Sequence, residues 1–268
     1  MQPLRQWWSR QARETRVAVV GGSLALVVLV GIGVAMVAGG GSSGDGSDDD
    51  TAVVFATARG GPPSVTHEAG PTTTAEPLPT EDPSLPTLKA RKDFTDEYGD
   101  PPRANLGRMK IPRIGVNAPI GERVVGSDLS LQYLNPYGPA DVTWYNFNVD
   151  TRFGGDIGDD KNAIFAAHVD YAALVPFAQA NYRGAGVFRD INLLNPGDLI
   201  EVTMHGKTVR YKVIWKHQVS ESDGDWGSIF SATVPEGDAI TLITCSGDFN
   251  TATREYDSRT VIRGQEIK

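Results

Sequence analysis

The single cysteine of the chain, Cys245, closes the apolar run "AITLITC" (239–245) and is followed by a Ser-Gly-Asp turn. At its ordinary pKa a thiol is only a few per cent thiolate at neutral pH, so a nucleophilic cysteine needs a basic or cationic partner. His168 stands in the same kind of place, because it ends the short apolar segment "NAIFAAH" (162–168). A cysteine and a histidine at strand ends are typical of thiol nucleophilic catalysis.

The other three histidines have weaker contexts. His67 lies in a Pro-rich and Thr-rich stretch, and His205 lies in a predicted hairpin turn, where solvated polar residues are expected. His217 follows "VIWK" at a strand end and is more plausible than those two. His168 remains the best candidate for the partner of the thiol.

Two arginines follow the cysteine and can supply hydrogen bonds to an oxyanion. Arg254 lies nine residues after Cys245 and Arg259 fourteen residues after it. The alternative to a catalytic role is a purely structural one. Free cysteine is among the most buried residue types, and each arginine alone could be a surface or ion-pairing residue. The combination of cysteine, histidine and arginine favours a catalytic set.

The net charge and the cysteine count exclude several classes of protein and of binding site. The formal net charge of −8 and the pI near 5.0 argue against a nucleic-acid-binding surface, which needs a basic face. One cysteine permits neither an internal disulfide nor a cysteine-based zinc cluster. The acidic residues form no loop of the EF-hand kind, so we expect neither a metal nor a cofactor.

The N-terminal region predicts a membrane anchor. Residues 17–38 are apolar and uncharged, and as a helix they would span about 33 Å, enough for a hydrocarbon core of about 30 Å. Arginines precede this run and aspartates follow it, which places residues 1–16 in the cytoplasm as a basic tail and the rest outside. A cleaved signal peptide is the alternative, but its apolar region should be only about 7–15 residues.

Two further segments follow the predicted anchor. Residues 39–102 are rich in Pro, Gly and Asp and predict a disordered stalk. Residues 103–268 read as a folded domain of many short strands, among them a hairpin over 198–215 with a His-Gly-Lys turn. Residues 170–182 could hold a short helix. We expect an all-β antiparallel barrel or sandwich, and no parallel sheet because no βαβ alternation is present.

At these residues the chain resembles the sortase family of cysteine transpeptidases. "TLITC" (241–245) matches the family signature Thr-Leu-x-Thr-Cys, "AAHVD" (166–170) resembles the histidine segment, and the likeness extends over most of 107–263. The "CSGDFN…REYDSRTVI" tail is most similar to class F or E sortases of actinobacteria. The resemblance implies an all-β, closed eight-stranded sortase-type barrel with short helices, preceded by the transmembrane helix and the stalk.

The resemblance also implies roles and partners. Cys245 would attack the Thr carbonyl of an LPxTG-like sorting signal, His168 would act as acid and base, and Thr244 would contact substrate or oxyanion. Arg254 or Arg259 would stabilise the oxyanion: strand-start position favours Arg259 and subclass likeness favours Arg254. The partners would be secreted proteins with C-terminal sorting signals and a cell-wall amine acceptor, served by a monomeric extracellular domain of a single-pass membrane protein.

The sequence differs from the sortase pattern at one position, and two other functions are compatible with its layout. Ala167 stands where classes E and F usually carry glycine. A non-catalytic extracellular binding domain on a stalk would also explain the layout. An L,D-transpeptidase-like peptidoglycan enzyme would be a second exported Cys/His enzyme, but its Ser-x-Gly-Cys element is not present.

Overall fold

The structure is a computed structural model that describes residues 78–129, 131, 136–252 and 255–268. The predicted cytoplasmic tail, the predicted anchor at 17–38 and Arg254 lie outside the described residues. Among the residues that it does describe, no helix is both long and apolar enough to cross a membrane.

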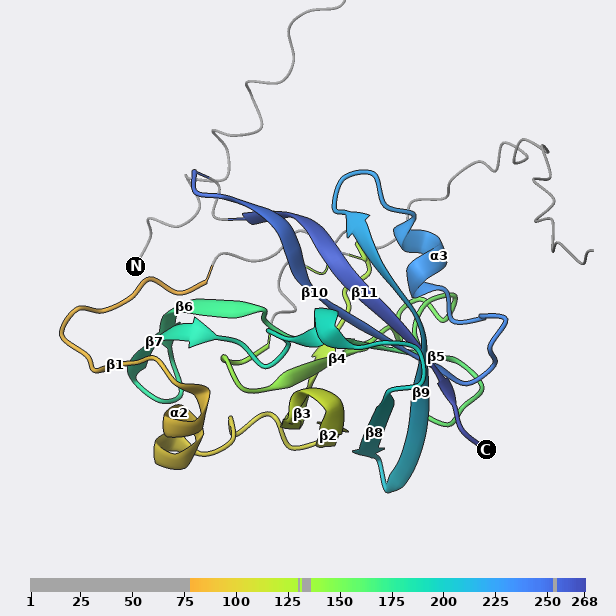
Figure 1. Cartoon of the computed structure of the whole chain (residues 1–268), viewed down its shortest axis with the longest axis horizontal. Coiled ribbons are helices and arrows are strands. Elements are labelled where there is room, and N and C mark those ends of the chain that lie inside the picture. The colour runs from red at the N-terminus through yellow and green to blue at the C-terminus, as the bar shows by residue number, and fades with distance from the viewer. Residues whose placement is uncertain (1–77, 130, 132–135, 253–254) are drawn as a thin grey trace, which may run out of the picture. The chain divides into compact units, whose positions relative to one another are not determined.

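Eight strands close into a barrel, in the order β10-β11-β9-β8-β2-β3-β4-β5 (Figure 1). The all-β class and the closed eight-stranded barrel are therefore confirmed. The strands are β2 (Gly107–Ile111), β3 (Val116–Val124), β4 (Val142–Asn146), β5 (Asn162–Ala166), β8 (Leu199–Met204), β9 (Lys207–Ser220), β10 (Ala239–Asn250) and β11 (Glu255–Glu266). Short helical segments accompany them: η1 (Pro112–Ile114), η2 (Ile191–Leu193) and α3 (Trp226–Phe230).

The barrel is mixed rather than antiparallel throughout. Strand β3 pairs with β4 in parallel, and β10 pairs with β5 in parallel. The expected antiparallel barrel is therefore confirmed only in part, because it contains these two parallel pairs. Parallel neighbours need long crossovers. The crossover between β5 and β10 (167–238) contains four strands and the short helices η2 and α3 in place of a single long helix. Helical periodicity in the sequence could not reveal them.

A smaller sheet of three strands lies beside the barrel, in the order β1-β7-β6. It consists of β1 (Thr87–Leu88), β6 (Asp170–Val175) and β7 (Ala180–Ala185). The short helix expected within 170–182 was wrong, because this segment forms the β6–β7 hairpin. Tyr171, Ala173 and Val175 are buried at every second position of β6, so the period of two outweighs helix propensity.

The predicted disordered stalk extended too far toward the C-terminus. Within residues 78–102 the chain forms β1 and helix α2 (Arg91–Tyr98), and the ring of Phe94 is fully buried against Tyr182, 5.6 Å away. The Asn181 side chain donates to the carbonyl of Asp82, which ties the segment to β7. The buried aromatic surface of Phe94 stabilises an order that the proline and acidic content of the segment did not predict.

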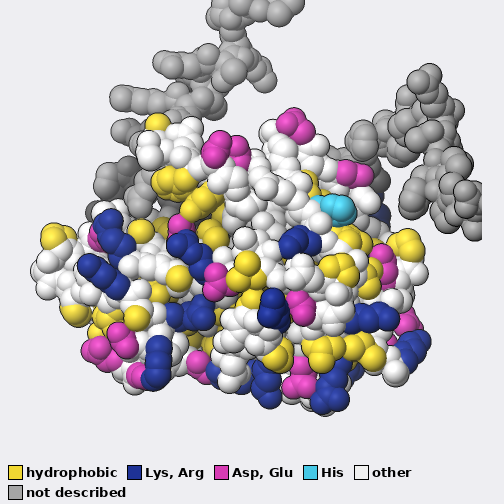
Figure 2. All heavy atoms as spheres, in the orientation of Figure 1, with side chains coloured by type: hydrophobic (Ala, Val, Ile, Leu, Met, Phe, Trp, Pro, Cys, Tyr) yellow, Lys and Arg dark blue, Asp and Glu magenta, His cyan; other side chains and the backbone are white. Residues whose placement is uncertain are grey.

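Two apolar clusters matter for the position of the site. Alternate residues of the strands fill the barrel, including Met109, Phe165 and Leu242. A second cluster packs under α3 and includes Tyr145, Phe230, Ile243 and Val261. Figure 1 shows α3 near β9 on the side of the barrel away from α2. In the same view, basic and acidic side chains are interspersed over the visible face of the described residues (Figure 2).

Candidate active site

Strand β10 brings the predicted catalytic residues together. Cys245 lies directly opposite Arg259 in the antiparallel ladder with β11. On its other edge β10 runs parallel to β5, where Ile243 is paired with Ala166. His168 lies two residues beyond Ala166, as Cys245 lies two residues beyond Ile243, so the histidine and the cysteine lie toward the same end of the barrel, although β10 itself continues to Asn250.

These residues line one small cavity of about 50 Å³. His168, Thr244, Cys245 and Arg259 contribute its polar side chains. Its apolar walls come from residues that the sequence analysis did not single out: Leu131, Pro136, Tyr145, Phe230 and Ile243. Four of them lie on segments other than the strand of Cys245, and no local pattern marks them. Ile243 carried the one usable signal, because it lies two residues before Cys245 on the same strand and so on the same face.

Burial and neighbouring charges set the acidity of the thiol. The partial burial of Cys245 raises its pKa above the ordinary value of 9.0, and the carboxylates of Glu221 and Asp170 add to this increase. The Arg259 guanidinium opposes them by stabilising the thiolate. The net pKa is raised, so the resting group at neutral pH is the thiol.

The imidazole of His168 is neutral at the same pH. Burial lowers its pKa to about 4, because desolvation disfavours the imidazolium. Its ring contacts the edge of Tyr171 at 5.1 Å between centroids. Its Nε2 atom is buried and has no hydrogen-bond partner among the described residues. A neutral ring with a free nitrogen beside a thiol can accept a proton when a substrate fills the cavity.

The backbone around His168 is fixed by neighbouring residues. The amide of Phe188 donates to the carbonyl of His168, and the amide of Gly186 donates to that of Val169. Position 186 requires glycine, because a Cβ there would lie 2.2 Å from the carbonyl oxygen of His168. The close approach of the two segments therefore holds the histidine at the mouth of the barrel.

Thr244 makes an internal contact. Its hydroxyl donates to the carbonyl of Ala167 at 2.7 Å, and the side chain is buried. This bond links the end of β5 to β10 one residue before both His168 and Cys245. Thr244 can thus fix the separation between the two strand ends that carry the acid–base group and the thiol.

Arg259 is buried and held by three contacts. Its Nη1 donates to the carbonyls of Tyr256 and Ser258 at 2.9 Å each, and its Nη2 forms an ion pair with Glu221 at 2.7 Å. The guanidinium is therefore held in a fixed orientation on the strand that faces Cys245. A preorganised cation at this place can stabilise negative charge on an atom bonded to the sulfur.

Asp141 supports the apolar wall of the cavity. Its fully buried carboxylate accepts the amide N–H groups of Tyr137 and Gly138, at 2.7 Å each, and so fixes the turn that begins at Pro136. Burial raises the pKa of Asp141 to about 7, while the Arg123 guanidinium acts in the opposite direction. No pattern in the sequence indicated this residue.

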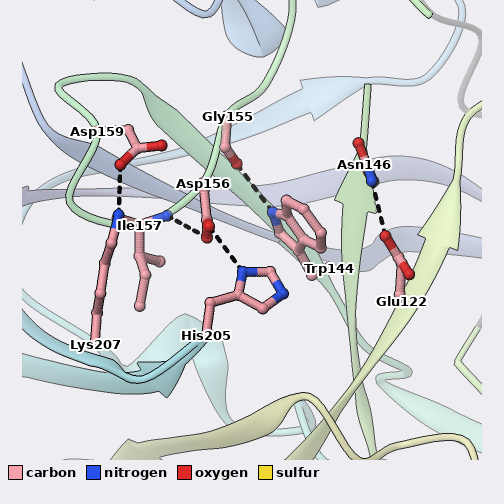
Figure 3. A network of polar contacts seen from close by, with 9 residues as sticks. All are labelled: Glu122, Trp144, Asn146, Gly155, Asp156, Ile157, Asp159, His205 and Lys207. Atoms are coloured by element: carbon pink, nitrogen blue, oxygen red, sulfur yellow. Dashed lines mark hydrogen bonds and ion pairs between the residues drawn. The ribbon is translucent and has the colours of Figure 1, made fainter. Parts of the chain in front are cut away.

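The remaining described histidines lie elsewhere. His205 contacts the Asp156 carboxylate through Nδ1 at 2.7 Å and packs on the edge of Trp144 (Figure 3). With the contact between Lys207 and Asp159, this network fastens the loop around residue 156 to the turn between β8 and β9. His217 packs against Trp215 on β9, with 4.8 Å between ring centroids. Neither histidine lines the cavity of Cys245.

Comparison with known proteins gives one family. The family model described as the Sortase domain matches residues 109–267, more than half of the chain. No curated protein sequence is significantly similar to the chain.

Solved structures similar to the chain are also sortases. Sortase E1 from Streptomyces coelicolor with a tripeptide in its active site is 22% identical, with a TM-score of 0.43, over 63% of this chain and 91% of that one. Sortase D5 from Clostridium perfringens is 20% identical, with a TM-score of 0.41, over 66% and 86%. Sortase C-1 from Actinomyces oris is 21% identical, with a TM-score of 0.41, over 72% and 91%.

Proposed function

The chain belongs to the sortase family and is a sortase-type cysteine transpeptidase; from this premise we propose that Cys245 is its nucleophile, His168 its acid–base group and Arg259 its oxyanion donor. The observation that carries the assignment is that strands β10 and β11 and the segment after β5 bring these three side chains to one cavity. There Cys245 faces Arg259 across the β10–β11 ladder, and His168 follows the parallel strand β5.

The first half-reaction follows from the protonation states. Both groups rest in neutral form, so His168 Nε2 takes the thiol proton as the sulfur of Cys245 attacks the peptide carbonyl carbon. A C–S bond forms, the carbonyl oxygen becomes an oxyanion, and the Arg259 guanidinium stabilises it. When the C–N bond breaks, the imidazolium returns its proton to the leaving amine. The product is a thioester on Cys245.

The second half-reaction runs the same steps in reverse with a new amine. His168 accepts a proton from the incoming amine as its nitrogen attacks the thioester carbonyl. The C–S bond then breaks, and the thiolate regains a proton from the imidazolium. Water in place of the amine gives hydrolysis.

The substrate in this proposal is an LPxTG-like sorting signal, cut between Thr and Gly and transferred to an amine of the cell wall. Support comes from the "TLITC" and "AAHVD" elements and from the apolar side chains of Leu131, Pro136 and Ile243 beside the thiol, which suit an extended apolar peptide. The "REYDSRTVI" tail supports membership of class F or E.

The proposal extends to the cell envelope. We assign residues 17–38 as an uncleaved single-pass anchor on their length and flanking charges, which would place the barrel outside the cell. The segment between anchor and barrel would be a shorter stalk than the composition predicts, because β1 and α2 already belong to the folded part.

A peptide-transfer assay with the full chain tests this function. An internally quenched LPxTG peptide is incubated with and without a triglycine amine. The expected result is release of fluorescence together with a ligated product that appears only with the amine. Cleavage that is unchanged by Cys245→Ala, or the absence of any cleavage of LPxTG-like and LAxTG-like peptides, would count against the proposal.

A further inference from the structure

A second cavity of about 410 Å³ lies beside helix α3. The helix contributes to both cavities, because Phe230 lines the one with Cys245 and Ile229 lines the other. Its lining includes the ring of Trp215 and the polar side chains of Ser228, Ser231, Thr233, Glu236 and Arg263. A hollow of this size, lined by one aromatic ring, several polar side chains and a buried cation, has the make-up of a ligand site.

Arg263 is the central residue of this cavity. It is 3% exposed, its Nη2 donates to the carbonyl of Ile229 at 3.1 Å, and its guanidinium carbon lies 5.2 Å from the centroid of the Trp215 ring. Its Nε is buried and has no hydrogen-bond partner within the described part of the chain. An N–H of a buried guanidinium without an acceptor is costly, and an acceptor on a ligand would remove this cost.

Glu236 provides a buried acceptor next to the buried donor of Arg263. Its Oε2 lies 3.5 Å from Arg263 Nη1, yet it is buried without a hydrogen-bond partner in the region that the structure describes. The pair therefore offers an unused donor and an unused acceptor next to each other. A ligand that fits both must carry an anionic acceptor and an N–H group a few atoms apart.

The wall of the cavity is fixed in advance. The Asn162 amide donates to the carbonyls of Ile229 and Ser231, and the Gln265 amide donates to that of Glu236. Asn162 is itself held by the buried hydroxyl of Thr241 at 2.7 Å. A preformed wall loses little conformational entropy when a ligand binds.

We propose that this cavity, the Arg263 pocket, binds the C-terminal residue of a peptide that ends in a free carboxylate. The carboxylate accepts hydrogen bonds from the Arg263 guanidinium, and the amide N–H of the same residue donates to Glu236. These two groups are only two bonds apart along the peptide, which matches the neighbouring donor and acceptor. A phosphate dianion fits less well, because it has no N–H group to donate to Glu236 and its second negative charge adds to the repulsion by that carboxylate.

The pocket is distinct from the transfer site, so its failure would leave the transpeptidase assignment intact. Arg263 lies four residues after Arg259 on β11, about 13 Å along the strand. The Cys245 cavity and the Arg263 pocket share no lining residue. The inference thus concerns an additional peptide-binding subsite, and it is tested by binding rather than by turnover.

Calorimetric titration of the full chain with acetyl-Ala-Ala and with its C-terminal amide tests the pocket. We expect the free acid to bind at least about ten-fold more tightly than the amide. Arg263→Gln should remove this difference. Arg210→Gln, which takes the same charge from an exposed position on β9 paired with Glu201, should keep it. Equal affinity of acid and amide for the wild-type protein would overturn the proposal.

A second variant guards against loss of folding by Arg263→Gln. Glu236→Gln keeps the guanidinium in place and changes only the group that accepts the ligand N–H. It should weaken binding of the free acid several-fold, with the melting temperature of each variant recorded alongside. Binding of the free acid that is unchanged in both Arg263→Gln and Glu236→Gln would place the ligand elsewhere and contradict the proposal.

Discussion

Cys245 and Arg259 occupy opposed positions of β10 and β11, in the same pair of an antiparallel ladder. Direct pairing fixes the two side chains relative to one another through the backbone rather than through a flexible loop. The Arg259 guanidinium lowers the pKa of the Cys245 thiol, while burial and two carboxylates raise it. Mutations of these residues and their neighbours can therefore test the roles proposed for Cys245 and Arg259.

The first prediction separates the two candidate arginines. Arg259→Gln should lower kcat for peptide cleavage by about a hundredfold or more, because a donor to the oxyanion is lost. Arg254→Gln should stay within a few-fold of the wild-type rate. The two variants are compared as full chains in one fluorogenic assay. The reverse ranking would transfer the oxyanion role to Arg254.

The second prediction concerns the thiol and its pH dependence. The pKa of Cys245 is raised, so its alkylation by iodoacetamide should have a midpoint above that of an ordinary thiol. Glu221→Gln removes a carboxylate that favours the protonated form and should shift this midpoint to lower pH. Arg259→Gln should shift it upward. Asp223→Asn, at an exposed neighbouring carboxylate, serves as the control. A midpoint that Glu221→Gln does not lower would contradict the electrostatics described for Cys245.

A third prediction follows from the hydroxyl of Thr244. Thr244→Val has nearly the same shape but leaves the buried carbonyl of Ala167 without its donor, at a cost of about 1–3 kcal/mol in the free energy of unfolding. Because the bond fixes the strand end before His168, kcat should fall more than KM rises. Thr244→Ser should restore both values. If Thr244 contacts substrate instead, KM will change most and stability little.

The fourth prediction concerns the segment before the barrel. Phe94→Ala should destabilise the folded part by about 3–5 kcal/mol, because a fully buried ring is removed from the cluster with Tyr171 and Tyr182. Urea unfolding measures the change, and Lys92→Ala, on the exposed side of α2, is the control. A change below about 1 kcal/mol would mean that the segment is not part of the cooperative fold.

Some strands and turns of the fold could be predicted from the sequence, and others could not. The strand end before His168, and the hairpin with its turn at His205 and Gly206, follow from local apolar patterns that pairing leaves intact. The strand end expected at Cys245 was wrong, because β10 continues to Asn250 in its ladder with β11, where pairing and not apolar burial extends the strand. Strand β1 and helix α2 could not be predicted, because their order depends on contacts such as Phe94 with Tyr182, far away in the sequence.

The residues of the candidate site also fall into those that the sequence predicts and those that only the structure reveals. Chemistry marks Cys245, His168 and the arginines by residue type, but only pairing selects Arg259 as the residue opposite the thiol. The apolar wall at Leu131 and Pro136, and the carboxylate of Asp141 behind it, carry no local signal. Their roles depend on contacts with residues that are distant in the chain, and such long-range placement is not encoded in periodicity.

Detection of the covalent intermediate is the sharpest test of Cys245 as the nucleophile. The full chain is mixed with an LPxTG-like peptide without an amine acceptor, quenched in acid, and measured by intact-mass spectrometry followed by peptide mapping. We expect a mass increase equal to the peptide fragment that ends at Thr, located on Cys245 and released by hydroxylamine. His168→Ala should form this adduct far more slowly. Cleavage of the peptide with an adduct on another residue, or undiminished cleavage by Cys245→Ala, would show that Cys245 is not the nucleophile.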